Sequence, residues 1–247
     1  MSKWVEGRVV GHTQWTDRLY SLRVDAEVEP FKAGQFTRLA LDIDGKLEPR
    51  PYSYVNAPHE RPLEFYFITV PDGPLTSHLV ALKPGEKILV SPKGTGLMVV
   101  TDLPEAENLW LLSTGTAVGP FLSILKTDEP WQRFKRIVLA YAVRTAAELS
   151  YRDLLERLQQ QHPGQFIFIP FVSREDTDFA LKARVPQALE DGRLEARAGI
   201  ELRADNSQVM ICGNPEMVKD TAAALEARGL KKHKKRDPGQ ITVENYW

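Results

Sequence analysis

The chain has 247 residues, of which 43% are hydrophobic and 26% are charged, as expected for a globular protein of one large or two ordinary domains. A formal net charge of -1 excludes a global field that would attract nucleic acid or a membrane surface. The single cysteine, Cys212, excludes an internal disulfide and an iron–sulfur or zinc site held by cysteines alone; the five histidines show no metal-ligand spacing.

The first residues, MSKWVEGRVV, lack the apolar region of a signal peptide, and no apolar stretch is long enough to span a bilayer. We therefore expect a cytoplasmic protein without a metal site and without nucleic-acid or membrane partners. Because no coiled-coil pattern or spare apolar stripe is evident, we also expect a monomer.

Residues 1–100 have the pattern of an antiparallel β-domain. Short runs rich in β-branched and aromatic residues are separated by Gly and Pro, which predicts a sandwich or barrel. Closure into a barrel would also hide the edges of the sheet. The strand-like runs are WVEGRVV, LYSLRV, QFTRLAL, LEFYFITV and EKILVS.

Residues 101–247 follow a different pattern, which begins after the polar segment TDLPEAEN. Strand-like runs alternate with helical ones, and this predicts a doubly wound α/β domain with a parallel sheet. Continuous apolar runs are typical of parallel strands that are buried on both faces. The strand-like runs are NLWLL, RIVLAYAV, QFIFIPFV and QVMIC, and the helical runs are GPFLSILK, SYRDLLERLQQQ and PEMVKDTAAALEARG.

A polar and aromatic cluster, RPYSY, lies at residues 50–54 of the β-domain. Pro51 favours an extended backbone from which Arg50 and Tyr52 project. The cluster could bind a planar ligand that carries a phosphate, with Arg50 on the pyrophosphate, Tyr52 stacked on the ligand and Ser53 hydrogen-bonded to its ring. An ordinary strand with an exposed arginine explains the same residues, and composition alone favours that simpler interpretation.

In the α/β domain, ligands are expected beyond the carboxyl ends of the strands. The first strand-like run is followed by STGTAVGP and a helix, which suits either a phosphate-binding helix N-terminus or a plain tight turn. The second run is followed by Arg144, and the third by Ser173 and Arg174, with Arg184 a few residues on. The fourth is followed by CGNPE, residues 212–216.

The arginines bear on the choice of nucleotide. A fold that prefers NAD usually has a carboxylate near the tip of its second strand, where it binds the ribose 2′-hydroxyl. Here the second and third tips carry Arg144 and Arg174, and an arginine fork matches a phosphate in geometry and charge. A surface salt bridge explains any one arginine alone, but three at one sheet edge favour a 2′-phosphate site and NADP over NAD.

Four motifs, in order along the whole chain, resemble those of the ferredoxin–NADP reductase family. Arg50-x-Tyr52-Ser53 resembles its flavin signature, and GPLTS, residues 73–77, is similar to its second flavin-phosphate loop. TGTAVGP, residues 114–120, resembles its nicotinamide-nucleotide loop, with an alanine in place of the second glycine. Cys212-Gly213 resembles the motif beside the nicotinamide, and the length and aromatic C-terminus are similar to those of the bacterial ferredoxin/flavodoxin–NADP reductases.

The resemblance implies an FAD-binding barrel in residues 1–100 and an NADP-binding α/β domain in residues 101–247. The implied FAD contacts are Arg50, Pro51, Tyr52, Ser53, Tyr66, Pro74, Leu75 and Thr76, with Thr116 close by. The implied NADP(H) contacts are Val143, Arg144, Ser173, Arg174, Arg184, Asn214, Pro215 and Glu216. Ser53, Cys212 and Tyr246 are the implied catalytic residues, although Cys212 is equally well explained as a small buried apolar side chain.

The chain ends on two aromatic residues, Tyr246 and Trp247. In the family a C-terminal aromatic covers the flavin face on which nicotinamide docks, so the resemblance implies that the tail returns to the flavin. Tyr246 is then the expected cover, and Trp247 is expected near the adenine end. Which ring covers which part stays open, since plant-type members end on the tyrosine itself; a frayed tail is the alternative.

The activity implied is that of a flavoprotein oxidoreductase that passes electrons between NADPH and ferredoxin or flavodoxin. The basic run KKHKKR, residues 231–236, is either a solvated loop or a docking surface for such acidic carriers. Three alternatives are an NAD(P)H-dependent flavin reductase, an electron-transfer subunit of a larger dehydrogenase and a non-catalytic binding module. The loop at 73–77 argues against the first, the lone cysteine against the second, and the arginines against the third.

Overall fold

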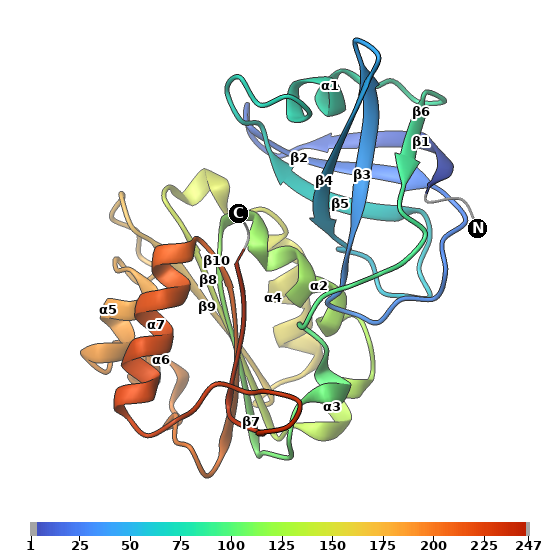
Figure 1. The fold of residues 1–247 in the computed structure, drawn as a ribbon. Helices are drawn as coiled ribbons and strands as arrows, with labels where there is room; N and C mark the ends of the chain where they lie inside the picture. Colours follow the sequence, from blue (N-terminus) through green and yellow to red (C-terminus); the bar gives the residue numbers. More distant parts are fainter. Residues whose placement is uncertain (1–3, 246–247) are drawn as a thin grey trace. The chain divides into compact units, whose positions relative to one another are not determined.

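A computed structural model describes residues 4–245 as two compact units. The first comprises the chain up to Val99 together with Gly119–Thr127, and the second comprises Val100–Val118 and the chain from Asp128 onward. Because the two units are separate bodies, each is described by itself (Figure 1).

The first unit is a six-stranded antiparallel sheet in the order β4-β3-β6-β1-β2-β5. Its core is formed by alternate residues of these strands, among them Leu22, Leu39, Phe65 and Val90, all of which are completely buried. The elements are β1 (Val5–Gln14), β2 (Leu19–Asp25), β3 (Phe36–Ile43), β4 (Lys46–Ser53), β5 (Leu63–Ile68), α1 (Thr76–Ala81), β6 (Lys87–Val90) and α2 (Gly119–Leu125).

This sheet has the barrel-like antiparallel fold expected from the sequence, but the barrel is not closed. Within residues 4–245, the edge strands β4 and β5 share no ladder, and only the isolated bridge Tyr54↔Phe65 lies beside them. Pro49 and Pro51 lie in β4, and a proline cannot donate to a neighbouring strand. The two prolines therefore leave β4 as an edge.

The helix α2 belongs to this unit although it follows β7 in the chain. All seven of its residues are buried, which leaves no solvent-facing stripe. The Ser123 hydroxyl donates to the carbonyl oxygen of Asn56 at 2.7 Å and ties the helix to the loop after β4.

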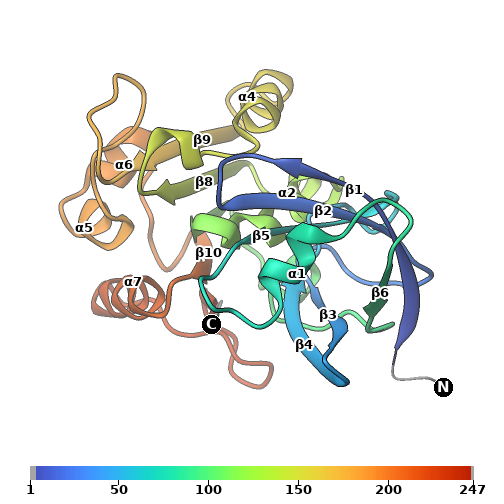
Figure 2. The same cartoon turned by 90° about the horizontal axis from the view of Figure 1, so that it is seen from above.

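The second unit is a parallel five-stranded sheet in the order β11-β10-β7-β8-β9. Helices α5, α6 and α7 cover one face and α4 lies on the other, so the doubly wound fold expected from the sequence is confirmed (Figures 1 and 2). The elements are η1 (Val100–Asp102), β7 (Asn108–Thr114), η2 (Gly115–Val118), α3 (Glu129–Arg133), β8 (Arg136–Val143), η3 (Ala146–Glu148), α4 (Arg152–Gln161), β9 (Phe166–Val172), α5 (Val185–Glu190), α6 (Arg193–Ala198), β10 (Ser207–Gly213), α7 (Pro215–Ala227) and β11 (Ile241–Asn245).

The parallel strands are buried along nearly their whole length, as their continuous apolar sequences predict. Val138, Ala140, Val209 and Ile211 pack with residues of α5, α6 and α7 in one cluster. Among the described residues, no helix is long and apolar enough to cross a bilayer.

Candidate functional site

The arginines predicted from the strand tips lie side by side in the second unit. The backbone N–H of Arg174 donates to the carbonyl oxygen of Arg144 at 2.9 Å, which extends the ladder between β8 and β9 by one step. Leu181 pairs in parallel with Phe171. Arg184 lies three residues after Leu181 and Arg174 three residues after Phe171, so both follow the bridge by the same number of residues. Backbone register therefore brings all three arginines to the carboxyl edge of the sheet.

The charges of these arginines are not neutralised by the rest of the described chain. Arg144, Arg174 and Arg184 are all exposed. Within residues 4–245 none of the three guanidinium groups forms an ion pair. Three exposed cations at one edge suit a ligand phosphate, which accepts charge-assisted hydrogen bonds from arginine. Val143 and Ser173, also predicted as contacts, directly precede Arg144 and Arg174 in the sequence. The backbone N–H of Ser173 donates to the carbonyl oxygen of Val143 at 3.1 Å.

Two other strand tips meet where Thr114 ends β7 and Gly213 ends β10. The Thr114 hydroxyl oxygen accepts the backbone N–H of Asn214 at 3.0 Å, across 100 residues of sequence. A Cβ at Gly213 would lie 2.1 Å from that oxygen, so only glycine allows this approach. Thr116 is buried in the following turn, η2.

Part of the predicted CGNPE site has a structural role. The Asn214 carboxamide oxygen accepts the N–H groups of Glu216 and Met217 at 3.0 and 3.3 Å and so caps α7. Pro215 occupies the first turn, where its missing N–H is not needed. The side-chain oxygen of Asn214 is thus already hydrogen-bonded within the helix cap. The backbone N–H of Asn214, bonded to Thr114, keeps the N-terminus of α7 at the strand tips.

Cys212 is completely buried in β10, next to Glu244 of β11 in the parallel register. Burial, and then the negative charge of Glu244, raise the pKa of the Cys212 thiol well above its ordinary value. The thiol is therefore neutral at physiological pH and is not a poised nucleophile. Sequence reasoning missed Glu244, because the strand pairing that brings it beside Cys212 cannot be seen in the sequence.

In the first unit, the residues of the RPYSY cluster occupy both faces of β4. Arg50 and Tyr52, two residues apart, share one face, whereas Pro51 and Ser53 lie on the other. Arg50 is exposed, donates to the Pro49 carbonyl at 2.7 Å and pairs with Glu48 at 3.4 Å. A phosphate ligand would have to compete with that carboxylate, whose pKa is lowered chiefly by its hydrogen bond with Lys46.

The aromatic part of the cluster packs on the barrel. Tyr52 contacts Phe67 of β5 edge-on, with the ring centroids 6.1 Å apart, and burial raises the pKa of its hydroxyl to about 12 despite the nearby Arg50 charge. Leu75 packs in the same core cluster as Phe67, which brings the loop at 73–77 toward this region. Tyr66 is buried but projects from the opposite face of β5 to Phe67.

The Pro74–Thr76 segment leads into α1, and the Thr76 hydroxyl oxygen accepts the Val70 N–H at 3.0 Å. The Ser53 hydroxyl, in contrast, is buried with no hydrogen-bond partner in the described chain. Leaving such a group unsatisfied costs about 1–3 kcal/mol, so a ligand that hydrogen-bonds Ser53 would be stabilised. Arg50 and Tyr52, on the other face of β4, fit an aromatic phosphate-bearing ligand such as FAD, and Ser53 at the end of the strand offers a further hydrogen-bonding group.

Tyr246 and Trp247 lie outside the described residues. The strand before them, β11, ends at Asn245 beside Gly213, at the carboxyl edge of the sheet. The basic run at 231–236 precedes β11 and bridges to its first residue, Ile241. At roughly 3.3 Å per residue, the four steps from Ile241 to Asn245 separate the run from this edge by about 13 Å. Closeness in sequence to the C-terminus therefore does not place the run at this edge, and its role as a docking surface stays a prediction.

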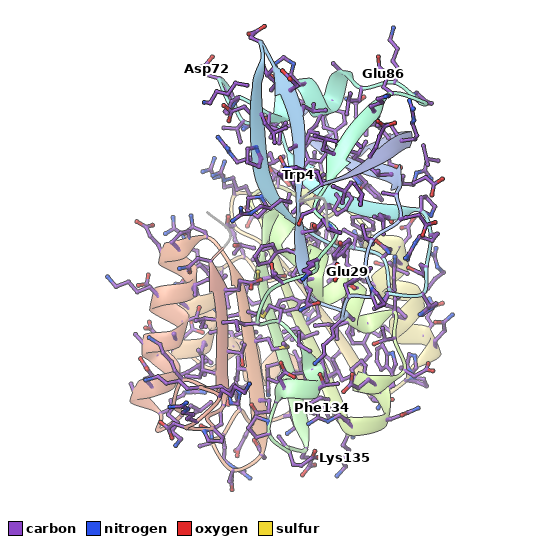
Figure 3. All side chains as sticks on the ribbon, turned by 45° about the vertical axis from the view of Figure 1, so that its right-hand side comes forward. Trp4, Glu29, Asp72, Glu86, Phe134 and Lys135 are labelled. Carbon is purple, nitrogen blue, oxygen red and sulfur yellow. The ribbon has the colours of Figure 1, made fainter. Side chains whose placement is uncertain are left out.

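A hollow in the described part of the second unit lies at the opposite, amino edge of the sheet. It has a volume of about 340 Å³ and is lined by the starts of β7 and β8 and by the loop before β10. Lys135, at the foot of this unit in Figure 3, pairs with Glu107 at 3.0 Å, and Arg203 pairs with Glu201 at 2.8 Å. Arg136 also lines the hollow and donates to the Lys135 carbonyl oxygen at 3.2 Å. Two of the three cations here are thus paired with carboxylates, whereas the three arginines of the carboxyl edge are not. Within residues 4–245, no group of three or more side chains could hold a metal ion.

Known proteins similar to this chain were found by sequence and by structure. An oxidoreductase NAD-binding domain family matches residues 111–223. The chain is 47% identical to a flavodoxin/ferredoxin–NADP reductase of Escherichia coli (strain K12), with 100% of both chains covered, and 35% identical to a ferredoxin–NADP reductase of Pseudomonas aeruginosa, with 99% and 98% covered. A solved ferredoxin NADP+ reductase from Neisseria gonorrhoeae with bound FAD and NADP is 33% identical, with a TM-score of 0.96 over 100% of both chains.

The close approach of two strand tips predicts a specific sensitivity at Gly213. We expect Gly213→Ala to lose about 2–3 kcal/mol of unfolding free energy, because its methyl group would overlap Thr114. Gly199→Ala is the matched control: φ is also positive, at 68°, but no atom lies within 4 Å of the new methyl group, so a loss of about 1 kcal/mol is expected. Urea denaturation measures both, and equal losses would show that the contact with Thr114 is unimportant.

Proposed function

Because the chain belongs to the flavodoxin/ferredoxin–NADP reductase family, we propose that it carries electrons between NADPH and ferredoxin or flavodoxin through a bound FAD. When bound, FAD supplies the redox chemistry, since a flavin exchanges a hydride with a nicotinamide and single electrons with a one-electron carrier. One observation supports NADP rather than NAD as the nucleotide. Arg144, Arg174 and Arg184 lie exposed at one edge of the sheet, without a counter-ion in the described chain.

FAD is proposed to bind to residues 1–100. Arg50 would hold the pyrophosphate after leaving Glu48, Tyr52 would stack on the cofactor, and the buried Ser53 hydroxyl would find its missing hydrogen-bond partner. The further contacts that the family resemblance implies within residues 1–100, Pro51, Tyr66, Pro74, Leu75 and Thr76, are part of the same proposal.

NADP is proposed to bind to residues 101–247, at the carboxyl edge of the parallel sheet. Arg144, Arg174 and Arg184 would share the 2′-phosphate, since three guanidinium groups supply both charge and forked donors. The N-terminus of α7, with Asn214, Pro215 and Glu216, would approach the rest of the nucleotide. Val143 and Ser173 would contribute through the backbone that fixes the arginines.

Cys212 and Glu244 are proposed to position the reacting end of the nucleotide. The Cys212 thiol stays protonated, because burial and the Glu244 charge both disfavour the thiolate. A neutral thiol packed beneath the end of β10 supports the strand tip from within and adds no competing nucleophile.

We also infer a cytoplasmic monomer. Cys212 is buried and unbonded, as is usual in a reducing compartment, and the sequence has no heptad pattern that would favour association.

The proposal predicts a yellow protein that prefers NADPH. The purified protein should show a flavin absorption spectrum that survives gel filtration, which a reductase using flavin as a dissociable substrate would not show. In anaerobic titrations NADPH should bleach the flavin at a concentration at least about 100-fold lower than NADH, because even two of the three arginine contacts, at about 1.5 kcal/mol each, would supply that difference. Equal bleaching by both would remove the arginine argument, and a protein unable to bind FAD would overturn the function.

The C-terminal pair gives a second prediction, which rests on the family resemblance. We propose that Tyr246 must give way whenever nicotinamide binds productively, with Trp247 beside it. A chain that ends at Asn245 should bind NADP+ at least about tenfold more tightly, since no side chain has to be displaced, and should turn over more slowly with ferredoxin. Binding is measured by difference spectroscopy, and unchanged affinity together with unchanged turnover would contradict this role.

A further inference from the structure

A carboxylate links the two loops that carry Arg144 and Arg174. Glu175 follows β9, and its Oε2 accepts the backbone N–H of Ala146, in the loop after β8, at 2.7 Å. Glu175 is itself exposed, and its partner lies 29 residues away in the sequence. The contact therefore fastens one arginine-bearing loop to the other at a point immediately next to Arg174.

A second carboxylate engages the N–H groups that precede Ala146. Glu148 Oε2 accepts the N–H of Arg144 at 2.9 Å and that of Thr145 at 3.4 Å. Three consecutive backbone donors beside Arg144 thus already have carboxylate acceptors. A phosphate at this edge cannot use them without displacing a carboxylate, so its recognition falls to the arginine side chains and depends on where the loops hold them.

The rest of the loop after β9 is fixed by other contacts. Asp176 pairs with Lys182 at 2.8 Å, and the guanidinium of Arg152 lies 4.0 Å over the ring of Phe179. Arg197 also donates to the carbonyl oxygen of Phe179 at 2.8 Å. Removing the Glu175 side chain would leave this end of the loop held only by the backbone hydrogen bonds of Ser173 and Arg174, while its far end stays in place.

We propose that Glu175 is a positioning residue for selectivity toward the 2′-phosphate: it fastens the Arg174 loop to the Arg144 loop so that both guanidinium groups reach one phosphate. This inference rests on the proposed function. The Glu175 carboxylate also brings a negative charge close to the proposed phosphate site. If charge alone mattered, removing it would tighten phosphate binding, whereas loss of the fastening contact would weaken it. The sign of the effect on binding therefore separates fastening from repulsion.

The test compares Glu175→Ala, Glu175→Gln and Asp178→Ala in the FAD-loaded full chain. Asp178 is exposed in the same loop and makes no hydrogen bond or ion pair within residues 4–245, so its replacement removes a charge without removing a contact. The probe is 2′,5′-ADP, which carries the 2′-phosphate, and its dissociation constant is measured by calorimetry. KM and kcat with NADH report on nucleotide binding without that phosphate.

We expect Glu175→Ala to weaken 2′,5′-ADP binding about tenfold, the lower end for loss of a charge-assisted hydrogen bond, and to leave KM and kcat with NADH within about twofold. Glu175→Gln should stay within about threefold of the parent, because its amide oxygen can still accept the Ala146 N–H. Asp178→Ala should bind as the parent does. Unchanged or tighter 2′,5′-ADP binding in Glu175→Ala would overturn the proposal.

Arg174→Ala distinguishes failure of this inference from failure of the proposed function. If Arg174→Ala weakens 2′,5′-ADP binding and Glu175→Ala does not, the arginine site stands and the fastening role is wrong. If Arg174→Ala has no effect, the phosphate site itself is wrong, and the inference fails with it.

Discussion

The backbone ladder of the parallel sheet is the constraint on which the nucleotide half of this protein depends. Four ladders fix the order β11-β10-β7-β8-β9, and parallel pairing brings every strand end to the same edge. One more hydrogen bond, from Arg174 N–H to Arg144 carbonyl, carries that order into the loops. Residues far apart in sequence thus lie together through main-chain geometry, to which the Glu175 side chain adds its contact with Ala146.

The same edge combines rigid and adjustable parts. Thr114 and Gly213 approach so closely that only hydrogen fits between them, and the Asn214 cap sets the start of α7 against this point. The arginines, by contrast, project from exposed loops. A rigid backbone at the strand tips, with long charged side chains beside it, suits a nucleotide that must bind selectively and also dissociate. The arginine side chains can adapt to the nucleotide while the backbone at the strand tips stays fixed.

Much of this arrangement could be predicted from the sequence, since it follows from local patterns. The apolar runs of β7 to β10 are continuous because both faces are covered, so both their type and their tips were predictable, including Arg144 and Arg174. Other elements have no such pattern. Helices α3, α5 and α6 have only five or six residues, too few for a helical period. The start of β4, before the extended segment predicted at residues 50–54, has no strand pattern of its own, and Pro49 weakens it further.

Contacts between distant segments could not be predicted. Glu244 lies beside Cys212, and Glu175 reaches Ala146, only because particular strands are neighbours. The basic run at 231–236 shows the reverse case, since it is close in sequence to the C-terminus but lies at the other end of β11. Closeness in sequence is a poor guide where a strand intervenes, because a strand carries the chain across the whole sheet.

The central claim is that Arg144 and Arg174 bind one phosphate together, and a double-mutant cycle tests it most directly. The quantity to measure is the ratio of kcat/KM for NADPH to that for NADH in the parent, Arg144→Ala, Arg174→Ala and the double variant. Residues that share a ligand group are coupled, so each single change should lower the ratio at least about tenfold, and the double change should lower it by less than the product of the two. Single changes that leave the ratio unaltered, or effects that multiply as for independent sites, would contradict the account.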